Sequence, residues 1–426
     1  RVLCPMAEDF NKMAFDTRDP PIDGPSGAPQ PFAPAPTQFA SSKWNDVFFA
    51  IVWWAFTIAA AGLGIYAYTQ AKDDVDKAIK NLADGHDVRW LFGWMAVALG
   101  ISVAISFVLV LLAKVVPTFF VWACIASFIL YLVGVAAWAM FYSVIYGILM
   151  LLMLVFYVVW VVGIRRRIPF ATVMFSTSGK LAFKFPGIFV VALGVTVVGV
   201  FLFLCFVCMA LWVSSTINST GAQIALYIGV LFLFYWDAEV LLNVIFTTAC
   251  GVCGTWYFLN TAAKNPTLGA FRRTMTYNFG SVCFGSLIVA ILKLLRSLVR
   301  MLRNSILGED GVCAFVACFF LCCIECCLSC LQSLVELFNE FAYAHVALYG
   351  KSYLRAAKET WHLFEQAGLT VLITDSILDI VLFMTNLFCG LATGGLVGLM
   401  AQSWTAAIAG GLLALFICGT VTTILN

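Results

Sequence analysis

The sequence contains little charge. Charged residues make up only 11% of its 426 residues, whereas hydrophobic residues make up 63%. Soluble domains carry about 25% charged residues, because polar side chains must cover their surface. A soluble globular protein, a disordered chain, a disulfide scaffold and a nucleic-acid-binding protein are therefore excluded for most of the sequence. The composition indicates an all-α polytopic membrane protein.

Sequence motifs of common enzyme families are missing as well. There is no P-loop, no GxSxG and no HExxH, and the chain has only three histidines, His86, His345 and His362. These motifs place the nucleophile, base or metal that each reaction needs. We therefore expect that the protein is not an enzyme and holds neither a cofactor nor a metal.

Proline is scarce outside one segment. Eight of the 12 prolines lie between Pro5 and Pro36, in a stretch rich in Gly, Ala and Ser that has no helical periodicity. Because proline fixes φ and lacks a backbone N–H, we predict an extended or disordered arm over residues 1–43 and a single transmembrane domain over 44–426. The chain begins with Arg1 rather than Met, and we expect the natural start to lie upstream.

Long apolar runs fill the rest of the chain. About 20 apolar residues, at about 1.5 Å each, cross the hydrocarbon core of a bilayer. This length predicts about ten transmembrane helices, at roughly 46–69, 91–113, 117–138, 140–163, 186–212, 222–258, 279 onward, 311–332, 371–399 and 403–425. The sixth run is too long for one straight span and contains Gly251 and Gly254, so we interpret it as a helix with a broken or re-entrant end.

Residues 332–366 alternate apolar and charged faces, which predicts an amphipathic interfacial segment before the last two helices.

The few basic residues predict the orientation. Five of them crowd the loop after the fourth apolar run, namely Arg165, Arg166, Arg167, Lys180 and Lys184. Because cytoplasmic loops carry an excess of Lys and Arg, we expect this loop and the N-terminal arm on the cytoplasmic side. The sequon Asn218-Ser219-Thr220 is then expected outside, which makes Asn218 a candidate glycosylation site.

A second basic cluster disagrees with this topology. Lys293, Arg296, Arg300 and Arg303 follow the seventh helix, where a simple count of crossings places them outside. Either the 222–258 segment crosses differently, or the basic stretch lies in the membrane interface.

One apolar run contains a stripe of polar and aromatic residues. Residues three and four apart share a face of a helix, so one face of the sixth run carries Phe232, Tyr235, Trp236, Glu239 and Asn243. Aromatic rings attract quaternary ammonium groups, and a carboxylate adds negative charge. The stripe is a candidate binding site for an organic cation. Alternatively, the rings only pack in the core, while Glu239 and Asp237 lie near a helix end or bond a neighbouring helix.

Seven of the 16 cysteines lie between Cys313 and Cys330. Their CxxC spacings suggest zinc, but the run is apolar and lacks polar groups that would orient thiolates. Reduced core cysteines or palmitoylation sites near the cytoplasmic face are favoured.

Several segments carry a family resemblance. They are Lys43-Trp44-Asn45-Asp46, Arg165 through Ala171, Gly251 through Phe258, Gly280 through Ile288, and the Cys-rich run followed by Asn339, Ala342-Tyr343, Ala347 through Lys351 and Ala356-Ala357-Lys358. In this order they resemble the choline transporter-like family, in particular its Pns1-like members from fungi and protists. The resemblance covers the chain from about residue 43 onward.

The resemblance implies a ten-helix protein of the plasma membrane or an endomembrane, with choline or ethanolamine as the usual candidate cargo. We expect a transmembrane transporter of choline or a similar organic cation that works by facilitative alternating access. Its expected partners are the small cation and membrane lipids, and not nucleic acid. The alternative is a structural or lipid-associated subunit of a larger membrane protein assembly, which would have protein partners and no transport activity.

Overall fold

A computed structural model describes residues 43–70, 72, 88–259, 265–306, 312–367 and 370–424. Within these ranges every regular element is a helix, and ten helices are long and apolar enough to cross a membrane. Each of the ten corresponds to one of the predicted apolar runs, so the all-α polytopic fold is confirmed. Of the predicted arm over residues 1–43, only Lys43 lies within the described ranges.

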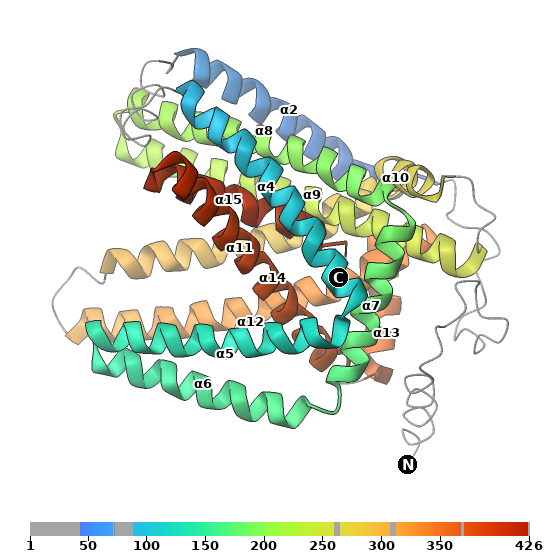
Figure 1. Ribbon diagram of the computed structural model, residues 1–426. Coiled ribbons are helices and arrows are strands. Elements are labelled where there is room, and N and C mark those ends of the chain that lie inside the picture. The colour runs from blue at the N-terminus through green and yellow to red at the C-terminus, as the bar shows by residue number, and fades with distance from the viewer. Residues whose placement is uncertain are drawn as a thin grey trace. The chain divides into compact units, whose positions relative to one another are not determined.

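The helices form two compact units. The first, here called the α9 unit, takes its described residues from 43–88 and 187–365. It contains α2 (Val47–Gln70), α8 (Gly187–Thr216), α9 (Thr220–Leu259), α10 (Pro266–Thr276), α11 (Phe279–Ile306), α12 (Val312–Tyr349) and α13 (Tyr353–Ala367). In Figure 1, α2, α8 and α9 run side by side, and α9 also packs against α11 and α12.

The second unit, here called the α14 unit, takes its described residues from 89–186 and 366–424. It contains α4 (Val88–Val115), α5 (Pro117–Tyr142), α6 (Val144–Ile164), α7 (Ile168–Lys184), α14 (Thr370–Ala401) and α15 (Trp404–Thr422). Gly390, Gly394 and Gly398 of α14 all face α15, and a Cβ at Gly394 would lie 2.8 Å from the Ala407 carbonyl oxygen. The overlapping GxxxG spacing therefore lets the two helix backbones approach closely.

Aromatic side chains form the core of the α9 unit. Trp53 of α2, Trp236 of α9 and Phe279 of α11 are buried in one cluster. The rings of Trp53 and Phe279 meet edge to face with centroids 5.2 Å apart, an arrangement that aromatic quadrupoles favour. Three helices that are distant in the sequence are thus held together by large apolar side chains.

The α9 helix is continuous, and the predicted break in it is wrong. Its 40 residues are about 60 Å long, roughly twice the thickness of a bilayer core. The helix runs through Gly251 and Gly254 without interruption. At Gly251 a Cβ would lie 3.1 Å from the Cβ of Ala270 in α10. The glycine therefore admits the close approach of α10 and does not break the helix.

A junction ties the start of α2 to two other segments of the same unit. The Asn45 side chain donates to the Gly350 carbonyl at 2.8 Å, and the Asp46 carboxylate accepts from Ser281 Oγ at 2.6 Å and from the Tyr353 backbone N–H at 2.8 Å. Asp46 and Gly350 both have positive φ, 52° and 60°. Segments 43–46, 278–281 and 350–353 therefore form one joint.

The amphipathic segment over 332–366 is helical, as predicted. Its first part continues α12 to Tyr349, and its second part is α13. Lys351, between the two, contacts both carboxylate oxygens of Glu359, at 2.7 and 2.6 Å. The position of this segment along a membrane interface stays a prediction.

Candidate functional site

The predicted stripe on α9 faces α11. Tyr235, Trp236, Glu239 and Asn243 each make a polar contact with α11. The fifth member, Phe232, packs against Trp236 with ring centroids 6.0 Å apart. The helical spacing thus predicted a shared face correctly. Whether this face binds a cation stays a prediction.

The aromatic members differ in burial. Trp236 is only 2% exposed, and its indole N–H donates to the Cys283 carbonyl oxygen at 3.1 Å. Phe232 and Tyr235 are half-buried, and the Tyr235 hydroxyl lies 2.8 Å from Ser297 Oγ. Trp236 therefore belongs to the core, as the alternative interpretation of the stripe required, whereas Phe232 and Tyr235 keep part of their surface free.

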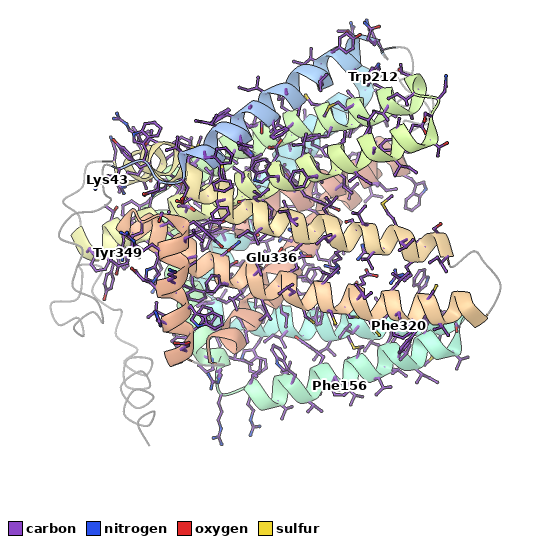
Figure 2. The ribbon with its side chains drawn as sticks, turned by 180° about the vertical axis from the view of Figure 1, so that it is seen from behind. Lys43, Phe156, Trp212, Phe320, Glu336 and Tyr349 are labelled. Atoms are coloured by element: carbon purple, nitrogen blue, oxygen red, sulfur yellow. The ribbon has the colours of Figure 1, made fainter. Side chains whose placement is uncertain are left out.

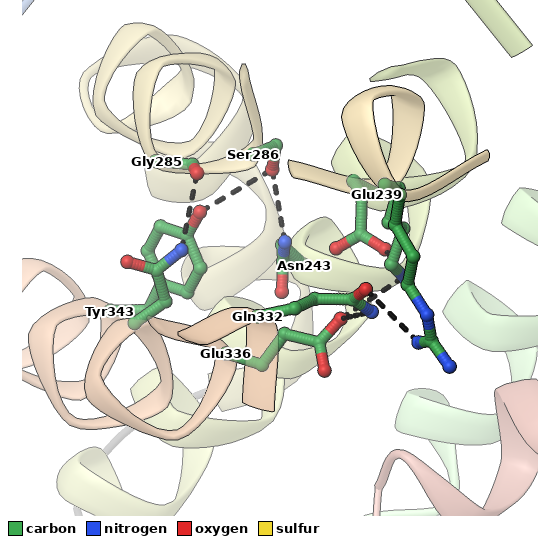
Figure 3. Close-up of polar contacts among 10 residues, drawn as sticks. Glu239, Asn243, Gly285, Ser286, Gln332, Glu336 and Tyr343 are labelled. Atoms are coloured by element: carbon green, nitrogen blue, oxygen red, sulfur yellow. Dashed lines mark hydrogen bonds and ion pairs between the residues drawn. The ribbon is translucent and has the colours of Figure 1, made fainter. Parts of the chain in front are cut away.

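Glu239 is paired with a lysine that the sequence did not assign to the site. The carboxylate is 8% exposed and forms an ion pair with Lys293 of α11. The same ammonium group lies 3.2 Å from Glu336 of α12. Figure 3 shows Glu239 and Glu336 approaching each other from their two helices. One lysine thus bridges two carboxylates that come from different helices.

Hydrogen bonds extend this polar region along α11. Asn243 donates to Ser286 Oγ at 2.9 Å, and Ser286 lies 3.3 Å from the Tyr343 hydroxyl. Asn339 donates to the Gly285 carbonyl at 3.1 Å and accepts from the Tyr353 hydroxyl. Tyr353, in α13, is buried, which raises the pKa of its phenol to about 12. The phenol therefore stays neutral and remains a donor at physiological pH.

The second basic cluster lies inside α11 and faces acidic and amide side chains of α12. Arg300 lies 2.8 Å from Glu325, which also pairs with Arg303. Arg296 donates to the Gln332 side chain at 3.3 Å. The basic residues therefore have partners within the α9 unit, and the side of the membrane on which they lie stays a prediction. Their spacing of three, four and three residues was the signal, since it places all four on one helix face.

Asp237 faces a different neighbour from Glu239. It is 3% exposed, and its Oδ1 accepts from Thr57 of α2 at 2.7 Å. Because residues two apart on an α-helix point about 200° apart, the two acidic side chains contact different neighbouring helices. Asp237 is therefore not part of the stripe.

Asn218 and five of the seven cysteines between Cys313 and Cys330 are exposed. Asn218 is exposed in the short non-helical link between α8 and α9. Its side chain is therefore accessible for the attachment of a glycan. Cys322, Cys323, Cys326, Cys327 and Cys330 of α12 are exposed. Within the described ranges, no group of three or more His, Cys, Asp or Glu side chains is placed to hold a metal. In Figure 2, Phe320 lies toward the end of α12 nearest its link to α11, and Glu336 lies further along the same helix.

Comparison with known proteins gives the family. The family described as plasma-membrane choline transporter matches residues 148–426. The chain belongs to the choline transporter-like family. It is 33% identical over 376 residues to a protein named PNS1 from Debaryomyces hansenii, covering 82% of this chain and 72% of that protein. A protein named PNS1 from Saccharomyces cerevisiae is 30% identical, covering 82% of this chain and 69% of that protein. A CTL-like protein from Dictyostelium discoideum is 29% identical, with coverage of 89% and 68%.

Membership of the choline transporter-like family confirms the resemblance seen in the sequence. Together with the ten apolar helices, it establishes a multi-pass integral membrane protein with a transporter role. Three of the segments that carried the resemblance, at residues 43–46, 280–288 and 347–351, meet at the junction around Asp46. These segments are therefore parts of one junction.

Proposed function

We propose that this protein moves choline or a similar organic cation across the membrane by facilitative alternating access, along a path beside the stripe of Phe232, Tyr235, Trp236, Glu239 and Asn243, in which Trp236 supports the other members from the core. The observation that carries the proposal is Glu239, an acidic residue that is 8% exposed, lies within a candidate membrane span and shares a helix face with three aromatic residues. Acidic side chains are costly inside a membrane, which favours a functional role for one that is present there.

The chemistry of the stripe fits a quaternary ammonium group. Such a group has no N–H to donate, so it is held by charge and by the faces of aromatic rings, each of which contributes about 0.5–2 kcal/mol. Phe232 and Tyr235 are half-buried and can offer their rings, while Trp236 supports Phe232 from the core. The carboxylate of Glu239 supplies the negative charge. A membrane potential adds about 2.3 kcal/mol per charge per 100 mV, which is enough to drive a cation inward without another coupled ion.

The second candidate function is a structural or lipid-associated subunit of a larger assembly. The observation that favours it is the exposed apolar surface of α12, where Phe319 and Phe320 are 61% and 62% exposed. Such a surface contacts lipid in either case, and in an assembly it would also contact a partner helix. This alternative predicts that the purified protein transports no cation.

The deciding experiment is uptake of labelled choline by vesicles that contain the purified full chain. Saturable uptake that a potassium diffusion potential accelerates supports the proposal. Glu239→Gln keeps the size of the side chain and removes its charge, and we expect it to raise the half-saturating choline concentration by about tenfold. Asp237→Asn is the matched control, because Asp237 faces Thr57 instead of the stripe.

Two results would count against the proposal. Absence of saturable uptake of choline, ethanolamine and related cations would favour the subunit. Normal uptake by Glu239→Gln would show that the cation follows another path. Trp236→Ala is a poor test by itself, because removing a side chain that is only 2% exposed disturbs the core as well as the stripe.

A further inference from the structure

Lys293 is placed between two carboxylates of unequal exposure. Its ammonium group pairs with Glu239 of α9 and lies 3.2 Å from Glu336 of α12. The side chain of Glu239 is 11% exposed, whereas that of Glu336 is 35% exposed. The lysine therefore has a buried partner and a more accessible partner within reach at the same time.

Neighbouring groups hold the accessible partner in place. Gln332 Nε2 donates to Glu336 at 3.0 Å, and Arg296 donates to the oxygen of the same amide at 3.3 Å. Glu336 is thus oriented by its own helix and, through Gln332, by α11 (Figure 3). On α9 the other nearby acid, Asp237, is bonded to Thr57 of α2, and on α12 Tyr343 is bonded to Ser286. The two glutamates are therefore the carboxylates that Lys293 contacts.

This arrangement bears on how a cation reaches Glu239. A quaternary ammonium group and the Lys293 ammonium cannot both lie against one carboxylate, because like charges repel and the organic group is bulky. Removing one member of a buried ion pair is costly, because it leaves the other charge buried without a partner. A cargo that displaced Lys293 into an apolar environment would bind poorly. Glu336 removes that obstacle, since it can keep the displaced ammonium group paired after a small side-chain rotation.

We propose that Lys293 is a tethered counter-ion. Its ammonium group pairs with Glu239 when no cargo is bound, and it pairs with Glu336 instead when a cationic cargo binds to Glu239. The inference rests on the proposed function, because it assumes that Glu239 is the carboxylate that meets the cargo. Lys293 and Glu336 are positioning residues in this scheme and do not contact the cargo. The empty protein keeps Glu239 neutralised without an inorganic cation from solution.

The first test compares choline binding to the reconstituted full chain and to Lys293→Met. Removing the tethered cation removes the competitor for Glu239, so choline should bind about tenfold more tightly to the variant at low salt. Sodium chloride should now compete with choline in the variant and have little effect on the unmodified chain. Arg303→Gln is the matched control, because it removes one positive charge from the same helix but contacts Glu325. It should leave both readouts unchanged.

A second variant tests whether Glu336 accepts the displaced ammonium group, and this test does not depend on how Lys293→Met folds. In Glu336→Gln the displaced ammonium group loses its acceptor, so choline should bind about tenfold more weakly although Glu239 and the aromatic residues remain. Lys293→Arg keeps the positive charge and should not show the gain in choline affinity. The opposite signs expected for Lys293→Met and Glu336→Gln separate this scheme from a purely structural role, which would weaken binding in both.

The results overturn different statements. If the unmodified chain shows saturable choline uptake but Glu336→Gln binds choline normally, the tethered counter-ion is wrong and the proposed function stands. The same conclusion follows if Lys293→Met binds choline no more tightly and gains no competition by sodium. If the unmodified chain neither binds nor transports organic cations, the proposed function is wrong and this inference falls with it.

Discussion

The backbone N–H of Tyr353 donates a 2.8 Å hydrogen bond to the carboxylate of Asp46, although 307 residues separate the two in the chain. The same carboxylate accepts from Ser281 at the start of α11. One side chain thus fixes the starts of α11 and α13 against the residues that lead into α2. Three segments that are far apart in the sequence are therefore held together by one carboxylate.

The first prediction concerns Asp46. Hydrogen bonds to a charged group contribute about 1.5–3 kcal/mol each when buried, and Asp46 is half-buried. We expect Asp46→Ala to destabilise the α9 unit by about 2–4 kcal/mol, measured as a lower melting temperature of the detergent-purified protein. Asp46→Asn keeps one acceptor and tolerates the positive φ of this position, so it should lose less. Equal losses in the two variants would contradict this account of the junction.

The second prediction concerns the close approach at Gly280. A Cβ at this residue would lie 2.2 Å from the Asp46 carbonyl oxygen and 2.5 Å from that of Asn45. These are backbone atoms that cannot rotate away, so Gly280→Ala should push residues 43–46 from α11 and lower the yield of folded protein. Gly229→Ala is the control, because a Cβ there meets nothing within 4 Å and alanine favours a helix. Normal melting of Gly280→Ala would show that the junction is not tight.

The ten helices could be predicted from the sequence because a membrane imposes one length and one polarity on every span. Apolar runs such as those at 117–138 and 403–425 were found close to their observed bounds for this reason. The continuity of α9 at Gly251 could not be predicted, since the contact that this glycine makes room for, with Ala270 of α10, is a tertiary one. A glycine in a sequence does not reveal whether it breaks a helix or admits a neighbour.

The candidate site was predictable on one side only. Helical spacing placed Tyr235, Glu239 and Asn243 on one face of α9, and the structure agrees. The partner, Lys293, is 54 residues away along the chain, and no local pattern connects it to Glu239. Basic residues on one face of an otherwise apolar helix do indicate that acidic partners exist, but they do not say on which helix.

The third prediction concerns the contact between α14 and α15. Gly394 is buried and a Cβ on it would lie 3.2 Å from the Cα of Gly411, whereas a Cβ on the adjacent Gly395 would meet nothing within 4 Å. We expect Gly394→Val to separate the two helices and to lower the melting temperature by several degrees, and Gly395→Val to have little effect. The two variants add the same side chain one residue apart, so similar melting of both would argue against the close contact.

The fourth prediction concerns Asn218. Its exposure in the link between α8 and α9 makes its side chain accessible to glycosyl transfer. Expression in a eukaryotic cell should give a protein whose mass falls after enzymatic deglycosylation, and Asn218→Gln should abolish that difference. Labelling of a cysteine introduced at this link only from the cytoplasmic side would overturn the proposed orientation of α8 and α9.

The last prediction concerns Glu325, which pairs with both Arg300 and Arg303. Glu325→Gln would leave two positive charges without their acceptor on α12. Complete removal of one partner from a buried ion pair costs about 3–5 kcal/mol, but Arg300 is half exposed, so we expect about 2–3 kcal/mol. The measurement is thermal melting of the full chain in detergent. Adding Arg303→Gln to Glu325→Gln should recover part of the loss, because one unpaired charge is then removed. A double variant that melts no higher than Glu325→Gln would show that the ion pair contributes nothing, and that the basic face of α11 is stabilised by solvent or lipid headgroups instead.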